Sequence, residues 1–321
     1  MTRKPLLGVF PLMPLVVKRN QELDMEGLKS NIAAYEEAGF QGYMAFGCMG
    51  EFYAVTEQEF KRIVDTAVDA TRRIACVFGV TYHNTSECVS RAKYADDAGA
   101  DGVMVGLPYL IPCTADAAFE HFRRVNDAVG EAQIMVYNNP FSFRFNITAE
   151  LWDRLMTLDR ITAVKESNGE AFHRLRVISH ISSRINVFSG TEPFLLGDSL
   201  VGGNSIISVA GTGSPRAALA LYDACLAKNL EIAIPLTVAF TNLFKDISNE
   251  NEVAWLKACA ELGGIRAGPP RAPYSPLDAA TRRGIADGLA RLEALVDKIG
   301  GRRTRARKVT GSSQGSNPKL P

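Results

Sequence analysis

Two kinds of apolar pattern alternate along the first 228 residues of the chain. Short apolar runs rich in Val, Ile and Leu indicate buried strands, and longer segments with apolar residues every three or four positions indicate amphipathic helices. The predicted strands are Leu6–Met13, Gly42–Phe46, Ile74–Val80, Gly102–Val105, Gln133–Tyr137, Ile161–Lys165, Ile185–Ser189 and Asn204–Ser208. The predicted helices are Asp24–Ala38, a helix from a capping box at Thr56 and Glu59 through Ala67, Ser86–Ala98, Ala115–Val129, Ala149–Met156, Ala171–His180, Glu192–Leu200 and Pro215–Ala227.

Eight short strands separated by helices predict an α/β fold, a (β/α)8 TIM barrel over residues 1–228, rather than an open doubly wound sheet. No glycine-rich dinucleotide fingerprint follows the first strand. Three further helices, Glu231–Asp246, Glu252–Glu261 and Ala279–Ile299, are interrupted by the proline-rich stretch Gly268–Pro276. We expect them to form a C-terminal helical extension over residues 229–299, packed on the barrel without a second core.

The composition is that of a globular protein, with 46% hydrophobic and 22% charged residues. The net charge of +1 depends on residues 300–321, which carry six basic and no acidic side chains, so the rest of the chain is mildly acidic. This balance argues against a nucleic-acid partner. We expect the basic tail to be disordered or to derive in part from cloning, with a functional basic arm as the alternative.

No apolar run approaches the roughly 20 residues that a membrane span requires, so we expect no membrane association and a cytoplasmic protein. The six scattered cysteines include no CxxC pair and fit free thiols in a reducing compartment. The four histidines form no HxxxH or HExxH pattern, and we expect no metal site.

Lys165 stands out as a cation at the end of an otherwise apolar predicted strand. Strand C-termini face the active site of a barrel, although a strand-end lysine could also simply point to solvent. In an apolar pocket a lysine loses its proton more easily and can attack a ketone to form an imine. An imine with a 2-keto acid stabilises a carbanion at C3. Tyr137, which ends the neighbouring predicted strand, could then move protons.

Small residues follow three other predicted strands. They are Gly47, Cys48, Met49 and Gly50 after the second strand, Gly190 after the seventh and Ser208 after the eighth. The paired glycines of the first loop allow a sharp turn that offers N–H groups to an anion, and a plain tight turn is an equal alternative. We take all six as candidate substrate-binding residues.

In this order and on these strands, the motifs resemble those of the dihydrodipicolinate synthase/N-acetylneuraminate lyase superfamily of pyruvate-dependent class I aldolases and hydro-lyases. The resemblance covers about residues 6–297 and rests on Gly-x-x-Gly-Glu at 47–51, Tyr-Asn-x-Pro at 137–140, the lysine at 165 and Ser-Gly at 189–190. It implies that Lys165 forms the Schiff base, that Tyr137 is the general acid and base, and that the N–H groups of Cys48 and Met49 bind the substrate carboxylate. It also implies a homotetramer or dimer and no metal or organic cofactor. Glu51 we expect to hold the loop.

Several positions depart from the superfamily's best-known members. Cys48 and Met49 stand where the synthases and lyases usually carry two hydroxyl residues. Leu110 replaces a second tyrosine with which the synthases complete a proton relay across a subunit contact. Ser142 replaces an arginine that grips the second substrate's carboxylate. The resemblance therefore disfavours the synthase reaction of lysine biosynthesis.

The segment Tyr137–Phe145 resembles instead the Tyr-x-Asn-Pro turn and the Phe-basic-Phe of hydratase-aldolases, which cleave arylidene-pyruvates. In that branch the residue matching Asn139 is expected to hydrogen-bond the substrate's oxygen. Phe141, Phe143 and Phe145 could wall an apolar aldehyde pocket, with Phe143 as the central candidate, or could equally pack in the core at a period of two.

We therefore predict a Schiff-base-forming, pyruvate-dependent aldolase of the hydratase-aldolase type, a carbon–carbon lyase that acts on pyruvate and an aldehyde. One alternative is a sugar-acid lyase or dehydratase on the same lysine, in which Thr191, Glu192 and Ser208 would face the substrate. The other is a barrel that binds a keto acid without catalysis.

Overall fold

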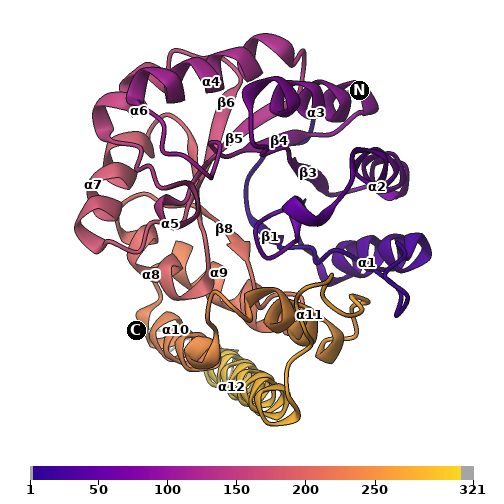
Figure 1. The fold of residues 1–321 in the computed structure, drawn as a ribbon. Coiled ribbons are helices and arrows are strands. Elements are labelled where there is room, and N and C mark those ends of the chain that lie inside the picture. Colours follow the sequence, from indigo (N-terminus) through magenta and orange to yellow (C-terminus); the bar gives the residue numbers. More distant parts are fainter. Residues whose placement is uncertain (1–2, 312–321) are drawn as a thin grey trace, which may run out of the picture.

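The computed structural model describes residues 3–311, with side chains up to residue 300. Eight parallel strands form one sheet in the order β1-β8-β7-β6-β5-β4-β3-β2. The sheet closes between its outer strands, because the N–H of Met13 donates to the carbonyl of Met44 at 2.9 Å beside a parallel bridge from Leu12 to Met44. Figure 1 shows the strands at the centre and the helices around them. The predicted (β/α)8 TIM barrel is confirmed.

The strands are shorter than the apolar runs that predict them. They are β1 Val9–Pro11, β2 Gly42–Ala45, β3 Ala75–Gly79, β4 Gly102–Val105, β5 Gln133–Asn138, β6 Ile161–Glu166, β7 Asn186–Ser189 and β8 Ser205–Ser208. The largest difference is at β1, predicted over Leu6–Met13. There Gly8 adopts a φ of +112° and interrupts the extended backbone.

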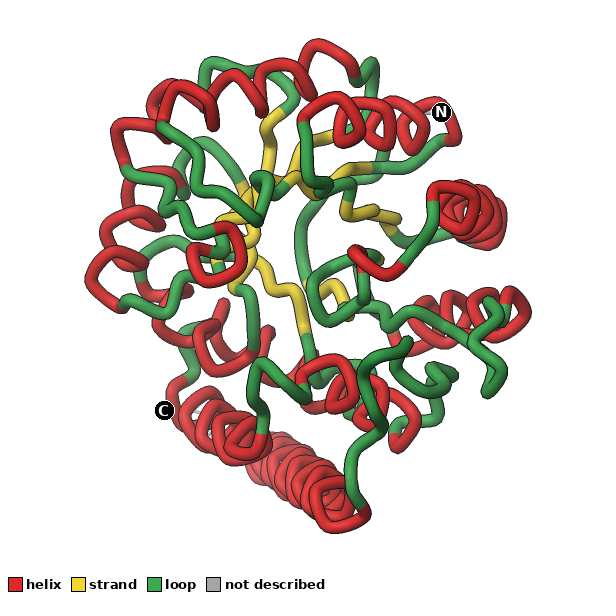
Figure 2. The backbone as a smooth tube through the Cα atoms, viewed as in Figure 1, coloured by secondary structure: helices red, strands yellow, loops and turns green. Residues whose placement is uncertain are grey.

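A helix follows each strand and packs on the outside of the barrel, as Figure 2 shows. The helices of this ring are α1 Met25–Ala38, α2 Glu57–Ala70, α3 Thr85–Ala98, α4 Ala115–Ala128, α6 Ala149–Leu155, α7 Ala171–Ile181, α8 Glu192–Leu200 and α9 Pro215–Leu226. The predicted capping box opens α2, where the Thr56 hydroxyl accepts from the N–H of Glu59 and the Glu59 carboxylate accepts from the N–H of Thr56.

Two short elements lie at the mouth of the barrel. They are the 3-10 turn η1 Phe52–Ala54 after β2 and the helical turn α5 Pro140–Phe143 after β5. The sequence does not predict α5. Asn139 begins it by accepting from the N–H of Ser142 at 3.2 Å, and Pro140 occupies its first position, where a missing N–H costs nothing.

The C-terminal extension consists of α10 Leu230–Leu243, the turn η2 Phe244–Asp246, α11 Glu252–Leu262 and α12 Ala279–Gly311. In Figure 1 these orange and yellow helices cover one side of the barrel. Trp255 and Leu256 of α11 belong to the same buried cluster as the barrel strands.

Helix α12 continues to Gly311, well past the predicted end at Ile299 and into the stretch expected to be disordered. Glycine inside a helix costs only about 1 kcal/mol relative to alanine, so the pair Gly300–Gly301 does not suffice to end the helix before a run of arginines that favour helix. Residues 312–321 of the expected tail lie outside the described part of the chain.

Candidate active site

Lys165 and Tyr137 are direct neighbours on adjacent strands. The register of β5 and β6 pairs Tyr137 with Lys165, and Asn138 with Glu166. Apart from Gln133 and Thr162 both strands are apolar up to these positions, and Tyr137 and Lys165 lie at their C-terminal ends. The Lys165 Nζ lies 4.5 Å from the centre of the Tyr137 ring. The sequence prediction that these two side chains meet is therefore realised in the fold.

The amine of Lys165 is buried, with 3% of the residue exposed. Among the residues that the structure describes, none forms a hydrogen bond or an ion pair with its Nζ. Burial lowers the pKa of Lys165 to about 8, because the charged form loses its hydration; the charges of Cys48 and Glu252 act in the opposite direction. About a tenth of this lysine is thus neutral and nucleophilic at pH 7, far more than for an exposed lysine.

A buried polar network fixes the strand end that carries Lys165. The carboxylate of Glu166 accepts from the Asn138 side-chain amide at 2.8 and 3.0 Å and from the N–H of Asn168 at 2.7 Å. Arg174 donates to the carbonyl of Glu166 at 3.0 Å and forms a buried ion pair with Asp198 at 2.5 Å. Because successive strand residues face opposite sides, Glu166 anchors β6 from outside while Lys165 faces the barrel mouth.

The hydroxyl of Tyr137 is the centre of a short hydrogen-bond chain. It donates to the Cys48 sulfur at 3.6 Å and accepts from the Asn139 side-chain amide at 2.9 Å. The Cys48 sulfur also lies 3.6 Å from the Ser142 hydroxyl. Burial, with the neighbouring Cys48 as the next cause, raises the pKa of Tyr137 well above 10. Burial also raises the pKa of the Cys48 thiol.

The loop 47–50 presents two of its four candidates to the cavity. Cys48 and Met49 line it, and in the described chain neither N–H group donates to another acceptor. Gly47 and Gly50 do not line the cavity. They allow close packing, since a Cβ on Gly50 would lie 3.0 Å from the N atom of Gly47 and 3.1 Å from the carbonyl oxygen of Met13.

Glu51 ends this loop and ties it to the C-terminal extension. Its backbone adopts a φ of 57°, and its side chain is fully buried. The carboxylate lies 2.6 Å from the Nζ of Lys257 in α11 and accepts from the N–H of Arg271 at 2.7 Å. Lys257 also donates to the carbonyl of Pro269 at 2.9 Å. These contacts fit the structural role expected for Glu51.

These side chains border a cavity of about 290 Å³ at the C-terminal end of the barrel. Its walls come from the loops after β1, β2, β5, β6, β7 and β8 and from the extension. The lining residues are Leu12, Cys48, Met49, Tyr137, Asn139, Phe141, Ser142, Lys165, Ser167, Gly190, Thr191, Val209, Phe244, Ile247, Asn249 and Glu252. Lys165 is the one cation in this set, and Glu252 is the one carboxylate.

A second pocket of about 200 Å³ adjoins this cavity on the outer side of the 47–51 loop, and we call it the outer pocket. The two share Cys48, Ser142, Asn249 and Glu252. The outer pocket adds a cluster of aromatic residues and one more carboxylate, with Phe52, Tyr53, Tyr109, Glu250, Val253 and Tyr274 in its lining. The two cavities together hold room for more than a three-carbon keto acid.

Among the phenylalanine and glycine candidates, Phe143 lies outside the lining of the cavity, whereas Phe141 and Gly190 belong to it. Phe143 is buried beneath the Tyr137 ring at 5.2 Å, with its ring also against Gly106, so it does not line the cavity. The phenylalanines do not alternate at a period of two, because residues 140–143 form the helical turn α5. Phe141, which is 73% exposed, lines the cavity in place of Phe143. Gly190 does line it; a Cβ there would lie 2.2 Å from the Ser167 hydroxyl oxygen.

Ser208, like Gly47, Gly50 and Phe143, does not line the cavity. Its hydroxyl donates to the carboxylate of Glu192 at 2.6 Å, and both residues are fully buried. Glu192 also accepts from the N–H groups of Val209 and Ala210, so it holds the loop after β8. Of the three polar residues that a sugar-acid site would use, Thr191 alone lines the cavity.

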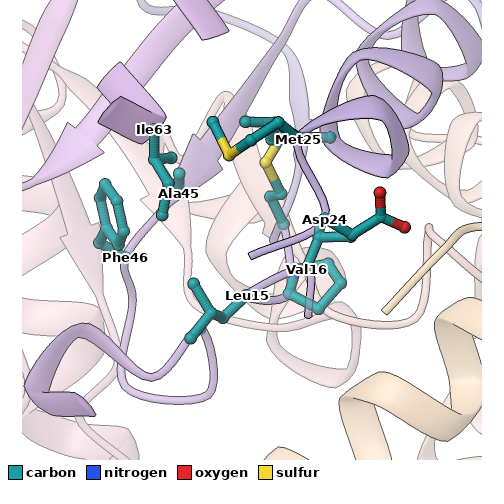
Figure 3. Close-up of a pocket in the computed structure, with 11 residues that line it drawn as sticks. Leu15, Val16, Asp24, Met25, Ala45, Phe46 and Ile63 are labelled. Carbon is teal, nitrogen blue, oxygen red and sulfur yellow. The ribbon is translucent and has the colours of Figure 1, made fainter. Parts of the chain in front are cut away.

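A third pocket lies on the other side of the 47–50 loop. Figure 3 shows it between Leu15, Ala45, Phe46 and Ile63, with the carboxylate of Asp24 directed away from these side chains. That carboxylate accepts from the N–H of Gly27 and caps α1. With a volume of about 10 Å³ and an apolar wall, this pocket is a packing gap rather than a binding site.

Two negative findings bear on the site. Within residues 3–311, no group of three or more His, Cys, Asp or Glu side chains could hold a metal ion. In the same range, no helix has the length and apolar character needed to cross a membrane.

The fold and this lysine site place the protein in the superfamily of pyruvate-dependent class I aldolases. A family model described as the dihydrodipicolinate synthetase family matches residues 5–291, and the chain belongs to this family. The superfamily expected from the motifs is thereby confirmed, and the chain is an enzyme of the carbon–carbon lyase class.

Among curated proteins, the 4-hydroxy-tetrahydrodipicolinate synthase of Methanospirillum hungatei is 30% identical over 89% of this chain and 99% of its own length. The structure is similar to a protein from Pseudomonas aeruginosa assigned as a dihydrodipicolinate synthetase, with 26% identity, a TM-score of 0.84 and coverage of 90% and 100% of the two chains. The sialic acid aldolase of Ruminococcus gnavus shares the fold, with a TM-score of 0.84 at 16% identity over 91% and 98%.

The curated relatives name a reaction that the sequence prediction rated as less favoured. Several of them, at 27–30% identity, carry the name 4-hydroxy-tetrahydrodipicolinate synthase. The hydratase-aldolase predicted from the sequence and the synthase named for these relatives both belong to the aldolase superfamily. They differ in the second substrate.

Glu252 is the site residue that sequence reasoning missed. It is the first residue of α11, where acids are common because they favour the positive end of a helix, so nothing in the sequence distinguishes it. Phe244, Ile247 and Asn249 escaped notice for a similar reason, because they belong to the extension rather than to a strand end.

Proposed function

We propose that the protein is a Schiff-base-forming, pyruvate-dependent aldolase of the hydratase-aldolase type. The observation that carries the proposal is Lys165, a buried amine that has no counter-ion among the described residues and lies beside the ring of Tyr137 in a cavity of about 290 Å³. A lysine of this kind is suited to attack the ketone of a 2-keto acid. Covalent chemistry at Lys165 supplies the electron sink, so the proposal includes no metal or organic cofactor.

In the cleavage direction, the neutral amine of Lys165 attacks the ketone of an arylidene-pyruvate and forms an imine with release of one water. A water molecule adds across the conjugated double bond, with its oxygen at C4 and its proton at C3. The hydroxyl at C4 then loses its proton, the C3–C4 bond breaks, and the aldehyde leaves. The enamine takes a proton at C3, and a second water hydrolyses the imine to pyruvate and the free amine.

The proposed acid and base is the Tyr137 hydroxyl. It is the polar group next to Lys165, and its hydrogen bonds to Cys48 and Asn139 orient it. Its raised pKa favours the neutral phenol, which can give a proton to the carbinolamine or to an oxygen at C4. The proposed partner of the substrate carboxylate is the pair of N–H groups of Cys48 and Met49, which have no acceptor in the described structure.

Two features support the hydratase-aldolase branch over the synthase reaction named for the curated relatives. Asn139 lines the cavity, where the branch is expected to use this residue to hydrogen-bond the substrate's oxygen, and its amide also donates to the Tyr137 hydroxyl. Neither the cavity nor the outer pocket has an arginine in its described lining, and Ser142 occupies the position of the synthase arginine. A sugar-acid lyase receives less support, because Glu192 and Ser208 bind each other rather than face the cavity.

The test is to incubate the protein with pyruvate and sodium borohydride and to weigh the intact chain. We expect a mass gain of one reduced pyruvate unit, which disappears in Lys165→Ala. Lys93→Ala removes an exposed lysine of α3 that lines neither cavity, and this matched control should still be labelled. The absence of labelling in the wild type, or labelling that survives in Lys165→Ala, would refute the proposal.

A second assay separates the branch from its rivals. With pyruvate present, consumption of an aromatic aldehyde and formation of a conjugated arylidene-pyruvate, followed by ultraviolet absorbance, would support the hydratase-aldolase. Turnover of aspartate semialdehyde in its place would identify the protein as a synthase, and release of pyruvate from a sialic acid would identify a sugar-acid lyase.

The remaining expectations from the sequence belong to this proposal. Pyruvate and an aldehyde are the proposed small-molecule partners, without nucleic acid or membrane. A homotetramer or dimer, implied by the resemblance, and a place in the cytoplasm, expected from the lack of a long apolar run, stay predictions.

A further inference from the structure

Glu252 occupies the junction between the Lys165 cavity and the outer pocket. It is the first residue of α11 and contributes to the lining of both. Its side chain is partly buried, and in the part of the chain that the structure describes its carboxylate has no hydrogen-bond or ion-pair partner. Every other residue shared by the two linings is uncharged. A substrate that extends from Lys165 towards the outer pocket must pass this carboxylate.

The charge around this path is unusual for a site that binds keto acids. Lys165 is the one cation in the described linings of both cavities, and pyruvate occupies it as an imine during the reaction. Beyond it lie two carboxylates, Glu252 and Glu250. A carboxylate on the second substrate would therefore meet negative charge and no arginine or lysine, which is a repulsive element of specificity.

The outer pocket also has a defined shape and chemistry. The rings of Phe52 and Tyr109 pack edge to face with centres 5.5 Å apart, and those of Tyr53 and Tyr274 with centres 6.2 Å apart. Flat aromatic walls favour a ring-shaped ligand. An unpaired carboxylate at the entrance favours a ligand with a hydrogen-bond donor, because a buried acceptor without a donor is costly.

We propose that Glu252 is a specificity residue for the second substrate, and that it accepts a hydrogen bond from a hydroxyl group of an aromatic aldehyde and excludes aldehydes that carry a carboxylate. This inference rests on the proposed aldolase function and adds the class of aldehyde. It also gives a physical reason for a preference among aldehydes that does not depend on the phenylalanines after β5.

The experiment compares condensation with pyruvate for three matched series of benzaldehydes, which carry a hydroxyl group, a carboxylate or hydrogen at the 2-, 3- or 4-position. Wild-type protein should prefer the best hydroxyl isomer to the best carboxylate isomer by roughly tenfold or more in kcat/KM. Glu252→Gln keeps the size of the side chain and removes its charge. It should raise KM for the hydroxyl series and bring the two series within about threefold of each other.

Glu231→Gln is the matched control, since Glu231 is also an acid in the first turn of a helix, α10, but is exposed and does not line either cavity. It should leave the preference unchanged. If Glu252 serves only to stabilise the start of α11, Glu252→Gln will shift the unfolding temperature and leave the ratio of the two series at its wild-type value, which overturns the inference.

Borohydride labelling with pyruvate separates the two levels of the proposal. Labelling of both wild type and Glu252→Gln with no preference for hydroxyl over carboxylate aldehydes overturns the inference and leaves the aldolase proposal standing. Labelling without turnover of any benzaldehyde also overturns the inference. A wild type that is not labelled overturns the proposed function itself.

Discussion

Burial gives Lys165 its chemical character. An exposed lysine titrates near 10.4 and is almost fully protonated at neutral pH, whereas Lys165 has lost its hydration without gaining a counter-ion. Cys48 and Glu252, the other groups that act on its pKa, oppose this lowering. The site thus holds a lysine that remains protonated part of the time and can still act as a nucleophile.

The first prediction concerns pH. Because the neutral amine attacks the ketone, the initial rate of borohydride labelling with pyruvate should rise as the pH rises through about 8, the lowered pKa of Lys165. Below that range the rate should fall about tenfold per pH unit, since each unit lowers the neutral fraction tenfold. Labelling rates measured between pH 6 and 10 check this. A rate that first rises near pH 10 would show that Lys165 behaves as an exposed lysine.

The second prediction separates imine formation from proton transfer. Tyr137→Phe keeps the ring beside Lys165 and the edge-to-face contact with Phe143, but removes the hydroxyl that contacts Cys48 and Asn139. We expect turnover with an aldehyde to fall about 10²- to 10⁴-fold, the usual contribution of a general acid or base. Labelling with pyruvate should still reach completion, although more slowly. Ser142→Ala removes the hydroxyl at the far end of the same chain of hydrogen bonds. It is the control and should lower turnover less than Tyr137→Phe does.

Individual residues show where sequence reasoning succeeds. Lys165 and Tyr137 could be predicted together because strand ends of a barrel converge, and a polar residue after an apolar run is visible in one sequence. Phe143 and Ser208 could not be assigned correctly, since their orientation depends on a helical turn and on a buried partner. Glu252 looks like an ordinary helix-start acid, and only packing of the extension brings it to the site.

At the scale of elements, the loop after β2 is held by a helix more than 200 residues away in the sequence. Glu51 and Lys257 are almost fully buried and lie 2.6 Å apart, and the N–H of Arg271 completes the contact. Two buried opposite charges are costly to desolvate. Removing one partner of such a pair lowers stability more than replacing both partners with apolar residues, because it leaves one buried charge uncompensated. The position of Cys48 and Met49, at the start of the same loop, therefore depends on α11.

The third prediction tests this link. Lys257→Met leaves the Glu51 carboxylate buried without its cation, and should lower the free energy of unfolding by about 3–5 kcal/mol. The double variant Glu51→Gln with Lys257→Met should cost less than Lys257→Met alone, because no uncompensated charge remains. Denaturant unfolding gives both values. Lys61→Met, which removes an exposed pair with Glu57, is the control and should cost less than about 1 kcal/mol.

The bounds of elements were predictable to within a few residues where the pattern is long, as in the helices α2 and α8. The predicted bounds were wrong where the backbone geometry of one or two residues decides where an element begins or ends. Gly8 shortens β1 by adopting a positive φ, and Asn139 with Pro140 begins a turn of four residues that is too short to show a helical period.

At the scale of the whole molecule, one hydrophobic cluster unites barrel and extension, and the barrel fold followed from the number and order of apolar runs. What the sequence could not indicate is which side of the barrel the extension covers. That depends on contacts between surfaces far apart in the chain, such as the packing of α12 on α10 and α9.

The fourth prediction concerns assembly. Leu110 and Ile111, in the loop after β4, expose 76% and 72% of their surface next to Tyr109 of the outer pocket. The expected dimer or tetramer would gain by burying two such side chains, at about 25 cal/mol per Å² of apolar surface. Leu110→Ser with Ile111→Ser should shift the mass in analytical ultracentrifugation towards that of a single 34.9 kDa chain.

Phe172→Ser provides the control for this experiment, because Phe172 is similarly exposed, at 75%, but lies in the first turn of α7. A wild type that sediments as a single chain would contradict the expected oligomer, and an unchanged mass in the double variant would show that this loop does not hold it together.

The entry of α11 into the cavity has a consequence for how this enzyme could change. The residues proposed to activate pyruvate lie on barrel strands and their loops, whereas Glu252, Asn249, Phe244 and Ile247 come from the extension. Part of the proposed aldehyde site is therefore encoded apart from the residues that form the imine, while Phe52, Tyr53 and Tyr109 of the outer pocket come from barrel loops. Exchanging residues 244–253 among homologues could diversify the aldehydes accepted while the imine chemistry is inherited unaltered.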